Sequence, residues 1–133
     1  MNLKLVFRIY GVITLINAAG IIFATQSFFE MAGMTVTADM INVGQGFGIA
    51  LLALAILSWR TPDIAGDAAA SYGQLFGFIS SINVLHLVYL IMTAQASGPP
   101  AYGNIVLMAV FAGLFFMYSK KTNTSGSNET RKT

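Results

Sequence analysis

The sequence predicts an all-α fold, an integral membrane antiparallel four-helix bundle with both termini cytoplasmic. First, 56% of the 133 residues are hydrophobic and 9% are charged, whereas a soluble domain carries about a quarter charged residues. Second, four hydrophobic stretches of about membrane length alternate with short connections. Third, the basic residues fall at three places, and these places alternate with connections that hold no Lys or Arg.

The placement of the basic residues predicts the orientation. They lie at the start of the first stretch, at the end of the second and after the fourth: Lys4, Arg8, Arg60, Lys120, Lys121, Arg131 and Lys132. Basic residues are retained on the cytoplasmic side during insertion. Both termini and the middle connection are therefore expected in the cytoplasm, and an even number of spans agrees with this.

We expect one domain over residues 1–119 and a disordered polar tail over 120–133, with spans at about 5–29, 40–59, 71–94 and 101–118. The first span could instead be a signal peptide. Its apolar stretch is of membrane length and Ala24-Thr25-Gln26 is a poor cleavage site, which favours an uncleaved helix. Arg8 is expected to reach lipid headgroups from this helix, and Trp59 and Arg60 are expected to mark the same interface at the end of the second.

The second and third spans both carry small residues at every fourth position. Gly44 and Gly48 lie near the start of the second span, and Gly73, Gly77 and Ser81 lie along the third. Small residues let helices approach closely in a membrane, so these two helices are expected to pack against each other. The glycines do not form a phosphate loop, because no Lys-Ser/Thr or strand context accompanies them.

The third helix is expected to begin at Thr61-Pro62-Asp63, before the membrane. Thr61 can cap a helix, Pro62 suits its first position and Asp63 complements its dipole. Gly66 is a candidate bend. The fourth span follows a tight outer turn at 97–100, and the tail after it is rich in Ser, Thr and Asn, which predicts disorder.

Four polar side chains, Asn17, Gln45, Asn83 and His86, are candidates for a ligand site. With a rise of about 1.5 Å per residue, they fall between the midplane and the outer surface. In a structural interpretation they hydrogen-bond the helices together. In a functional one they face a small cavity that binds a lipid or quinone-like molecule, with His86 as donor or proton carrier.

Several classes of chemistry are disfavoured. The chain has no cysteine and one histidine, so no metal site is predicted. Haem ligation by His86 is disfavoured because it would need a partner chain or an unusual second ligand, such as Met. The carboxylates lie outside the predicted spans, so no Ser-His-Asp set and no other catalytic residues are assigned. No cofactor is predicted, apart from a quinone or lipid ligand, and no nucleic-acid partner.

Arg8 and Gly11 in the first span, together with the run from Gly44 to Gly48, suggest a family. With these residues, the pattern of loops and span lengths from about Leu3 to Tyr118 resembles the DoxX-like group of small four-helix bacterial inner-membrane proteins. The resemblance implies a four-helix fold and a multi-pass location in the bacterial inner (plasma) membrane. Some members look like accessory subunits of quinone-linked oxidoreductases. Asn42 or Gln45 stands here where an acidic residue is expected in that group.

Three functions follow from these features. The first is a non-catalytic accessory or assembly subunit, with the lipid bilayer and other membrane subunits or a homo-oligomer as partners. The second is a binder or transporter of a small lipid or quinone-like molecule in an outer-leaflet polar pocket. The third is an enzyme subunit that uses His86.

Overall fold

A computed structural model describes the backbone over residues 2–129 and side chains through Lys120. Its helices are α1 (Leu3–Phe23), α2 (Thr25–Met31), α3 (Ala38–Ile64), α4 (Ala69–Met92) and α5 (Pro99–Glu129), with the 3₁₀ turn η1 (Gly66–Ala68) before α4. The described chain contains no strand, which confirms the all-α prediction. Four helical segments are long and apolar enough to span a membrane: Leu3–Phe23, Ala38–Ile64, Gly66–Met92 and Pro99–Lys120.

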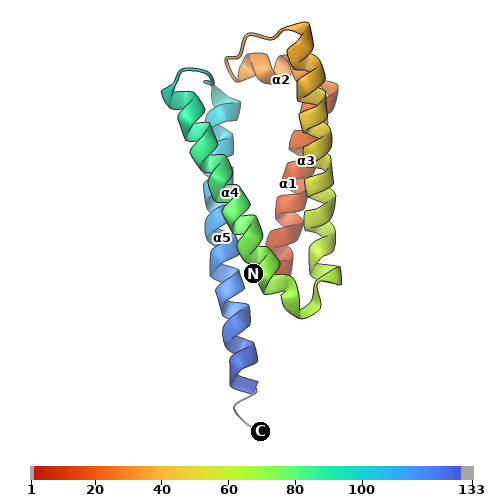
Figure 1. The fold of residues 1–133 in the computed structure, drawn as a ribbon, viewed down its shortest axis with the longest axis vertical. Helices are drawn as coiled ribbons and strands as arrows, with labels where there is room; N and C mark the ends of the chain where they lie inside the picture. Colours follow the sequence, from red (N-terminus) through yellow and green to blue (C-terminus); the bar gives the residue numbers. More distant parts are fainter. Residues whose placement is uncertain (1, 130–133) are drawn as a thin grey trace.

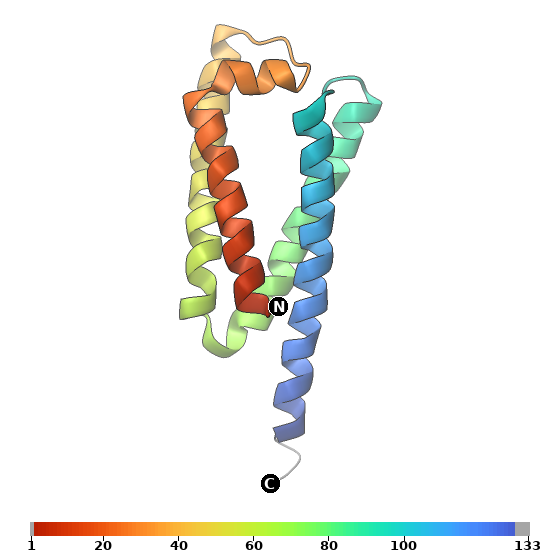
Figure 2. The same cartoon turned by 180° about the vertical axis from the view of Figure 1, so that it is seen from behind.

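The long helices form two pairs, α1 with α3 and α4 with α5 (Figures 1 and 2). The pairs meet near the start of α1 and spread apart toward the other end, where α2 lies across the gap. The start of α1, the end of α5 and the turn between α3 and α4 lie toward the same end of the molecule. We call this the inner end and the end that carries α2 the outer end.

The glycines of α3 face α1 and α2. A Cβ added to Gly48 would lie 2.7 Å from Ile22 Cγ1 and 3.3 Å from the Ile22 backbone nitrogen. A Cβ on Gly44 would collide with Phe29, and one on Gly11 of α1 would lie 3.1 Å from the Ala55 backbone oxygen. The small residues of this pair therefore set a close approach between α1 and α3.

The glycines of α4 face α5. A Cβ on Gly73 would collide with Ser119, and one on Gly77 would lie 3.0 Å from Phe116 Cε1. Ser81 is half-buried, and its hydroxyl donates to the Gly77 carbonyl oxygen at 2.9 Å. The prediction that the second and third spans pack on each other is wrong. A smooth helix face must receive larger side chains, and here Ile22 and Phe116 of other helices provide them.

An aromatic cluster joins the two pairs in their inner half. The buried core consists of Leu3, Val6, Phe7, Tyr10, Phe76, Phe111 and Phe115. The Phe7 ring centroid lies 5.1 Å from that of Phe76 and 4.9 Å from that of Phe115, both at edge-to-face angles. Ser58 adds a hydrogen bond from its hydroxyl to the Phe7 carbonyl oxygen, at 2.7 Å. Such edge-to-face pairs are the favoured packing of aromatic rings.

The first predicted span, 5–29, breaks into two helices. Ala24 leaves helical geometry (φ −132°, ψ 40°) after its N–H donates to the Gly20 carbonyl oxygen at 2.9 Å. Helix α2 then begins at Thr25 and turns across the outer end (Figure 1). The continuous span to Phe29 is therefore wrong. After the break, Phe28 and Phe29 of α2 line the space between the helix pairs.

The boundary between the second and third spans also differs from the prediction. Helix α3 continues through Pro62 to Ile64, so no new helix begins at Thr61. The Thr61 hydroxyl donates to the Leu57 carbonyl oxygen at 2.7 Å instead of capping a helix. Pro62 lies inside this helix two residues before its end, and it cannot donate the backbone hydrogen bond that other residues make there. The predicted bend at Gly66 is confirmed, with φ +49°.

The polar tail stays a prediction. The described backbone of α5 is helical to Glu129, and residues 130–133 lie outside the described part of the chain.

At the inner end, Arg8 is held by α3. Its Nη2 lies 3.1 Å from Asp63 Oδ2, and its guanidinium carbon lies 4.6 Å from the Trp59 ring centroid. Lys4 Nζ pairs with Asp63 Oδ1 at 2.9 Å. Arg8 thus has protein partners where only lipid headgroups are expected from the sequence. Trp59 and Arg60 are exposed, and their contact with headgroups stays a prediction.

At the outer end, two turns are joined by close backbone contact. The Ser97 N–H donates to the Ala32 carbonyl oxygen at 2.7 Å, which ties the turn after α2 to the turn between α4 and α5. Gly98 has φ +86°, and a Cβ there would collide with the Met31 carbonyl oxygen. This junction closes the wide end of the space between the pairs.

We expect Gly98→Ala to lower the free energy of unfolding by about 2 kcal/mol, since the substitution adds left-handed strain to a clash with a main-chain oxygen. Gly66→Ala is the matched control, because Gly66 also has a positive φ but no atom within 4 Å of its added Cβ. It should lose about 1 kcal/mol from strain alone. Equilibrium unfolding in mixed micelles measures both, and equal losses would show that the junction does not depend on the close approach at Gly98.

Candidate functional site

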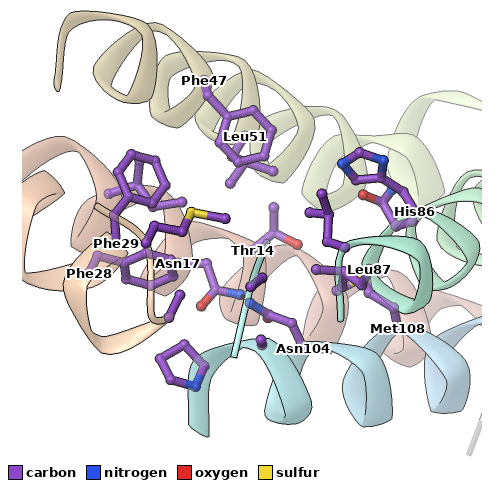
Figure 3. A pocket seen from close by; sticks show the side chains of 18 of the residues that line it. Thr14, Asn17, Phe28, Phe29, Phe47, Leu51, His86, Leu87, Asn104 and Met108 are labelled. Carbon is purple, nitrogen blue, oxygen red and sulfur yellow. Dashed lines mark hydrogen bonds between the residues drawn. The ribbon is translucent and has the colours of Figure 1, made fainter. Parts of the chain in front are cut away.

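A cavity of about 270 Å³ lies between the two helix pairs in the outer half of the molecule (Figure 3). Every helix contributes side chains to it. The lining residues are Tyr10, Thr14, Asn17, Ile21, Phe28, Phe29, Ala32, Met34, Phe47, Leu51, Leu54, Asn83, His86, Leu87, Leu90, Ala96, Pro100, Ala101, Asn104 and Met108. The lining is mostly apolar with a few polar groups, the composition typical of small-molecule sites.

Helix α1 supplies the polar side of the cavity. Tyr10, Thr14 and Asn17 are spaced by four and three residues, which places them on one helix face. Tyr10 and Thr14 are buried and Asn17 is half-buried. This face of α1 therefore points into the space between the helix pairs.

Helix α2 covers the outer side of the cavity with Phe28 and Phe29 (Figure 3). These two rings were not among the predicted site residues, because the sequence places them at the end of a continuous span. The polar run Thr25-Gln26-Ser27 within an apolar stretch is the sequence signal that indicates the break.

Asn17 and Asn104 connect α1 with α5 across one side of the cavity. Asn17 Nδ2 donates to Asn104 Oδ1 at 3.4 Å, and both side chains are half-buried. Each amide keeps further donor or acceptor capacity. Asn104 was absent from the predicted set, although an amide in an apolar span is the same signal that identified Asn17.

Asn83 and His86 lie on α4, three residues apart, and both side chains line the cavity while remaining exposed. Asn83 Nδ2 donates to the Ile79 carbonyl oxygen of its own helix at 2.9 Å, which leaves its Oδ1 free to accept. Asn83 therefore bonds within α4, whereas the structural interpretation expects bonds between helices.

Gln45 does not line the cavity. Its side chain is exposed on α3, and the cavity side of that helix is formed by Phe47, Leu51 and Leu54. Gln45 precedes Phe47 by two residues, a rotation of about 200° around a helix. The prediction that Gln45 belongs with the other three residues is wrong, because it matches their depth but not their direction.

Thr14 carries a buried hydroxyl that makes no hydrogen bond in the described part of the chain. Other hydroxyls in helices, those of Thr25, Thr61 and Ser81, donate to the carbonyl oxygen four residues earlier. That local bond is the usual solution in apolar surroundings. A buried polar group without a partner costs about 1–3 kcal/mol. Thr14 therefore has unused hydrogen-bonding capacity inside the cavity wall.

Among the residues that the structure describes, none of those lining the cavity is Asp, Glu, Lys or Arg. The ion pairs of Lys4 and Arg8 with Asp63 belong to the inner end. Among the described residues, no group of three or more His, Cys, Asp or Glu could hold a metal ion. The polar groups of the cavity are hydroxyls, amides and one imidazole, which recognise a ligand through hydrogen bonds.

Comparison with protein-family models, with curated proteins and with solved structures found no match for this chain. The resemblance to the DoxX-like group therefore stays a prediction. A function is argued from the cavity and its residues, because a fold alone does not specify one.

Proposed function

We propose that this protein binds a small lipid or quinone-like molecule in the cavity between its helix pairs. The observation that carries the proposal is a cavity of about 270 Å³. Its lining is mostly apolar and also includes the polar residues Thr14, Asn17, Asn104 and His86. Four helical segments are apolar enough to span a membrane, so lipid tails would surround the protein. A ligand would then reach the cavity from the bilayer. Few, well-placed polar groups in such a space give orientation and specificity.

We place the cavity in the outer half of the membrane, in an antiparallel bundle with both termini in the cytoplasm. Support comes from Lys4, Arg8 and Arg60, which belong to helix ends at the inner end of the molecule. The segment from Phe23 to Met40 at the outer end carries no Lys or Arg. Basic residues favour the cytoplasmic side, in a bacterial inner (plasma) membrane as elsewhere.

Native mass spectrometry on the protein extracted from its own membranes in mild detergent tests this function. We expect the intact chain, or a homo-oligomer of it, to retain a small molecule that dissociates on activation. A chain that carries no small molecule under conditions that preserve the fold would contradict the proposal.

His86 gives the same experiment a residue-level test. We expect His86→Leu to reduce the retained fraction about tenfold, since a lost hydrogen bond to a ligand is worth about that factor. Stability should change by less than about 0.5 kcal/mol, because His86 is exposed. Gln45→Leu is the matched control, an exposed polar side chain of similar predicted depth outside the cavity. If both variants retained the same fraction of the small molecule, His86 would not be a ligand-binding residue.

A second candidate is the accessory subunit. Its support is that Gly46 on α3 and Gly103 and Gly113 on α5 have no atom within 4 Å of an added Cβ. A further membrane helix could approach closely at such positions. In the native mass spectra this function predicts additional polypeptides, whereas the ligand-binding function predicts a small molecule.

A further inference from the structure

We infer that the cavity selects an uncharged head group, held by a hydrogen bond to the Thr14 hydroxyl, with its apolar tail leaving between α3 and α4 into the bilayer. This inference rests on the proposed function and names the chemical class of its ligand. It is carried by an unsatisfied buried hydroxyl, by the absence of ionised side chains from the lining, and by the side on which the cavity is open.

Thr14 is 3% exposed, and its Oγ1 is buried without a hydrogen-bond partner. Figure 3 shows it near the middle of the lining side chains, with Phe47 and Leu51 on one side and Asn104 on the other. The Tyr10 hydroxyl lies beside the Thr14 and Ser80 side chains. Thr14 lines the cavity, so its unpartnered hydroxyl is the group that a ligand head group would engage.

Two further buried hydroxyls, those of Ser80 and Ser119, also lack a hydrogen-bond partner among the described residues. Neither residue lines the cavity. The chain therefore offers a matched comparison between a free hydroxyl that faces the cavity and one that does not.

The lining restricts the charge of the head group. In the described part of the chain it holds no Asp, Glu, Lys or Arg, and the titratable groups among these lining residues are Tyr10 and His86, the latter on the exposed rim. An ion removed from water without an opposite charge is strongly disfavoured. Carbonyl or hydroxyl head groups avoid this penalty and can bond to Thr14, whereas phosphate, carboxylate and quaternary ammonium heads cannot avoid it.

The size and openings of the cavity restrict the tail. A volume of about 270 Å³ is below the range of about 300–1,000 Å³ that encloses drug-sized ligands. A head group fits, but a long tail must lie outside. The Asn17–Asn104 bond crosses the side between α1 and α5, and Phe28 and Phe29 cover the outer end. The side between α3 and α4, flanked by Leu51 and Leu87, remains as the exit.

A neutral acceptor head on an apolar tail occurs both in isoprenoid quinones and in neutral lipids such as monoacylglycerols. The test uses the purified full chain in nanodiscs and photoreactive probes with identical alkyl tails and different heads, namely an alcohol, a monoacylglycerol, a sulfonate and a trimethylammonium. A short-tailed quinone competes against the labelled alcohol. Competition by quinone but not by unlabelled monoacylglycerol identifies the quinone as the source, and the converse identifies the neutral lipid.

We expect the alcohol and monoacylglycerol probes to label α3 and α4 at least tenfold more than the two charged probes do. Equal labelling by charged and neutral probes would overturn the uncharged class while leaving a ligand-binding cavity intact. Labelling confined to α1 and α5 would overturn the exit between α3 and α4. No competable labelling by any probe would overturn this inference. An absence of retained small molecule in the native mass spectra is the separate result that would defeat the proposed function itself.

Thr14→Val keeps the shape of the side chain and removes its hydroxyl. We expect about tenfold weaker labelling by the alcohol probe, with recovery in Thr14→Ser, and no loss of folded protein because the hydroxyl has no partner to lose. Ser119→Ala removes a partnerless hydroxyl away from the cavity and should leave labelling unchanged. Unchanged labelling in a folded Thr14→Val protein would overturn the role of Thr14.

Discussion

Gly48→Leu is expected to lower the free energy of unfolding by about 3 kcal/mol, the upper range for overpacking a tight contact. An added Cβ at this position already lies 2.7 Å from Ile22 Cγ1 and 3.3 Å from the Ile22 backbone nitrogen. A leucine must therefore move the α1 backbone, not only a flexible side chain. Equilibrium unfolding in mixed micelles, with a rising fraction of denaturing detergent, measures the loss.

Gly46→Leu is the matched control, two residues away on the same helix. No atom lies within 4 Å of a Cβ added to Gly46, so a leucine there projects into open surroundings. It should be neutral or slightly stabilising, because leucine is a better helix former than glycine by up to about 1 kcal/mol. A loss at Gly46 as large as that at Gly48 would mean that the Gly46 face is covered in the folded protein, and would favour the accessory-subunit function.

The contrast between these glycines explains what the sequence could predict about packing. The fourfold spacing of Gly44 and Gly48 correctly indicates a smooth face that another helix approaches. It carries no information about which helix does so, since Ile22, which lies against Gly48, looks like an ordinary apolar residue in the sequence. The pairing of α1 with α3 and of α4 with α5 therefore had to come from the structure.

The helix boundaries show a similar limit. Hydropathy predicts four segments of membrane length, because it sums over many residues, and all four are present. It does not detect the break at Ala24, because the short polar run Thr25-Gln26-Ser27 is averaged with the apolar residues around it. The Thr61-Pro62-Asp63 run is typical of a helix start, but in the structure Pro62 lies inside α3, two residues before its end.

The sequence predicts the depth at which the candidate site residues lie in the membrane. The structure adds the direction in which each side chain points. Asn17, Asn83 and His86 all line one cavity, as their depth suggests, while Gln45 at a similar depth points elsewhere. Depth follows from sequence position, but direction depends on which helix lies opposite. Thr14 could not be singled out from the sequence, because a threonine in a helix usually bonds to its own backbone.

Phe7→Ala should remove the contact that joins the two helix pairs, with a loss of about 3 kcal/mol in the free energy of unfolding. Phe7 is 0% exposed, and its ring packs edge-to-face on Phe76 of α4 and on Phe115 of α5. In a membrane the separated helices are solvated by lipid, so the loss comes from packing that lipid tails do not reproduce.

The matched control for Phe7→Ala is Phe23→Ala, which removes the same atoms from the other end of α1. Phe23 is 87% exposed, so its variant should change stability by less than about 0.5 kcal/mol. The cavity gives a second readout, because its walls belong to both helix pairs and keep their spacing only while the inner core holds them together. Labelling by the alcohol probe should therefore weaken in Phe7→Ala, although Phe7 does not line the cavity. Unchanged labelling together with the loss of stability would show that the α2 junction at the outer end is sufficient to hold the cavity in shape.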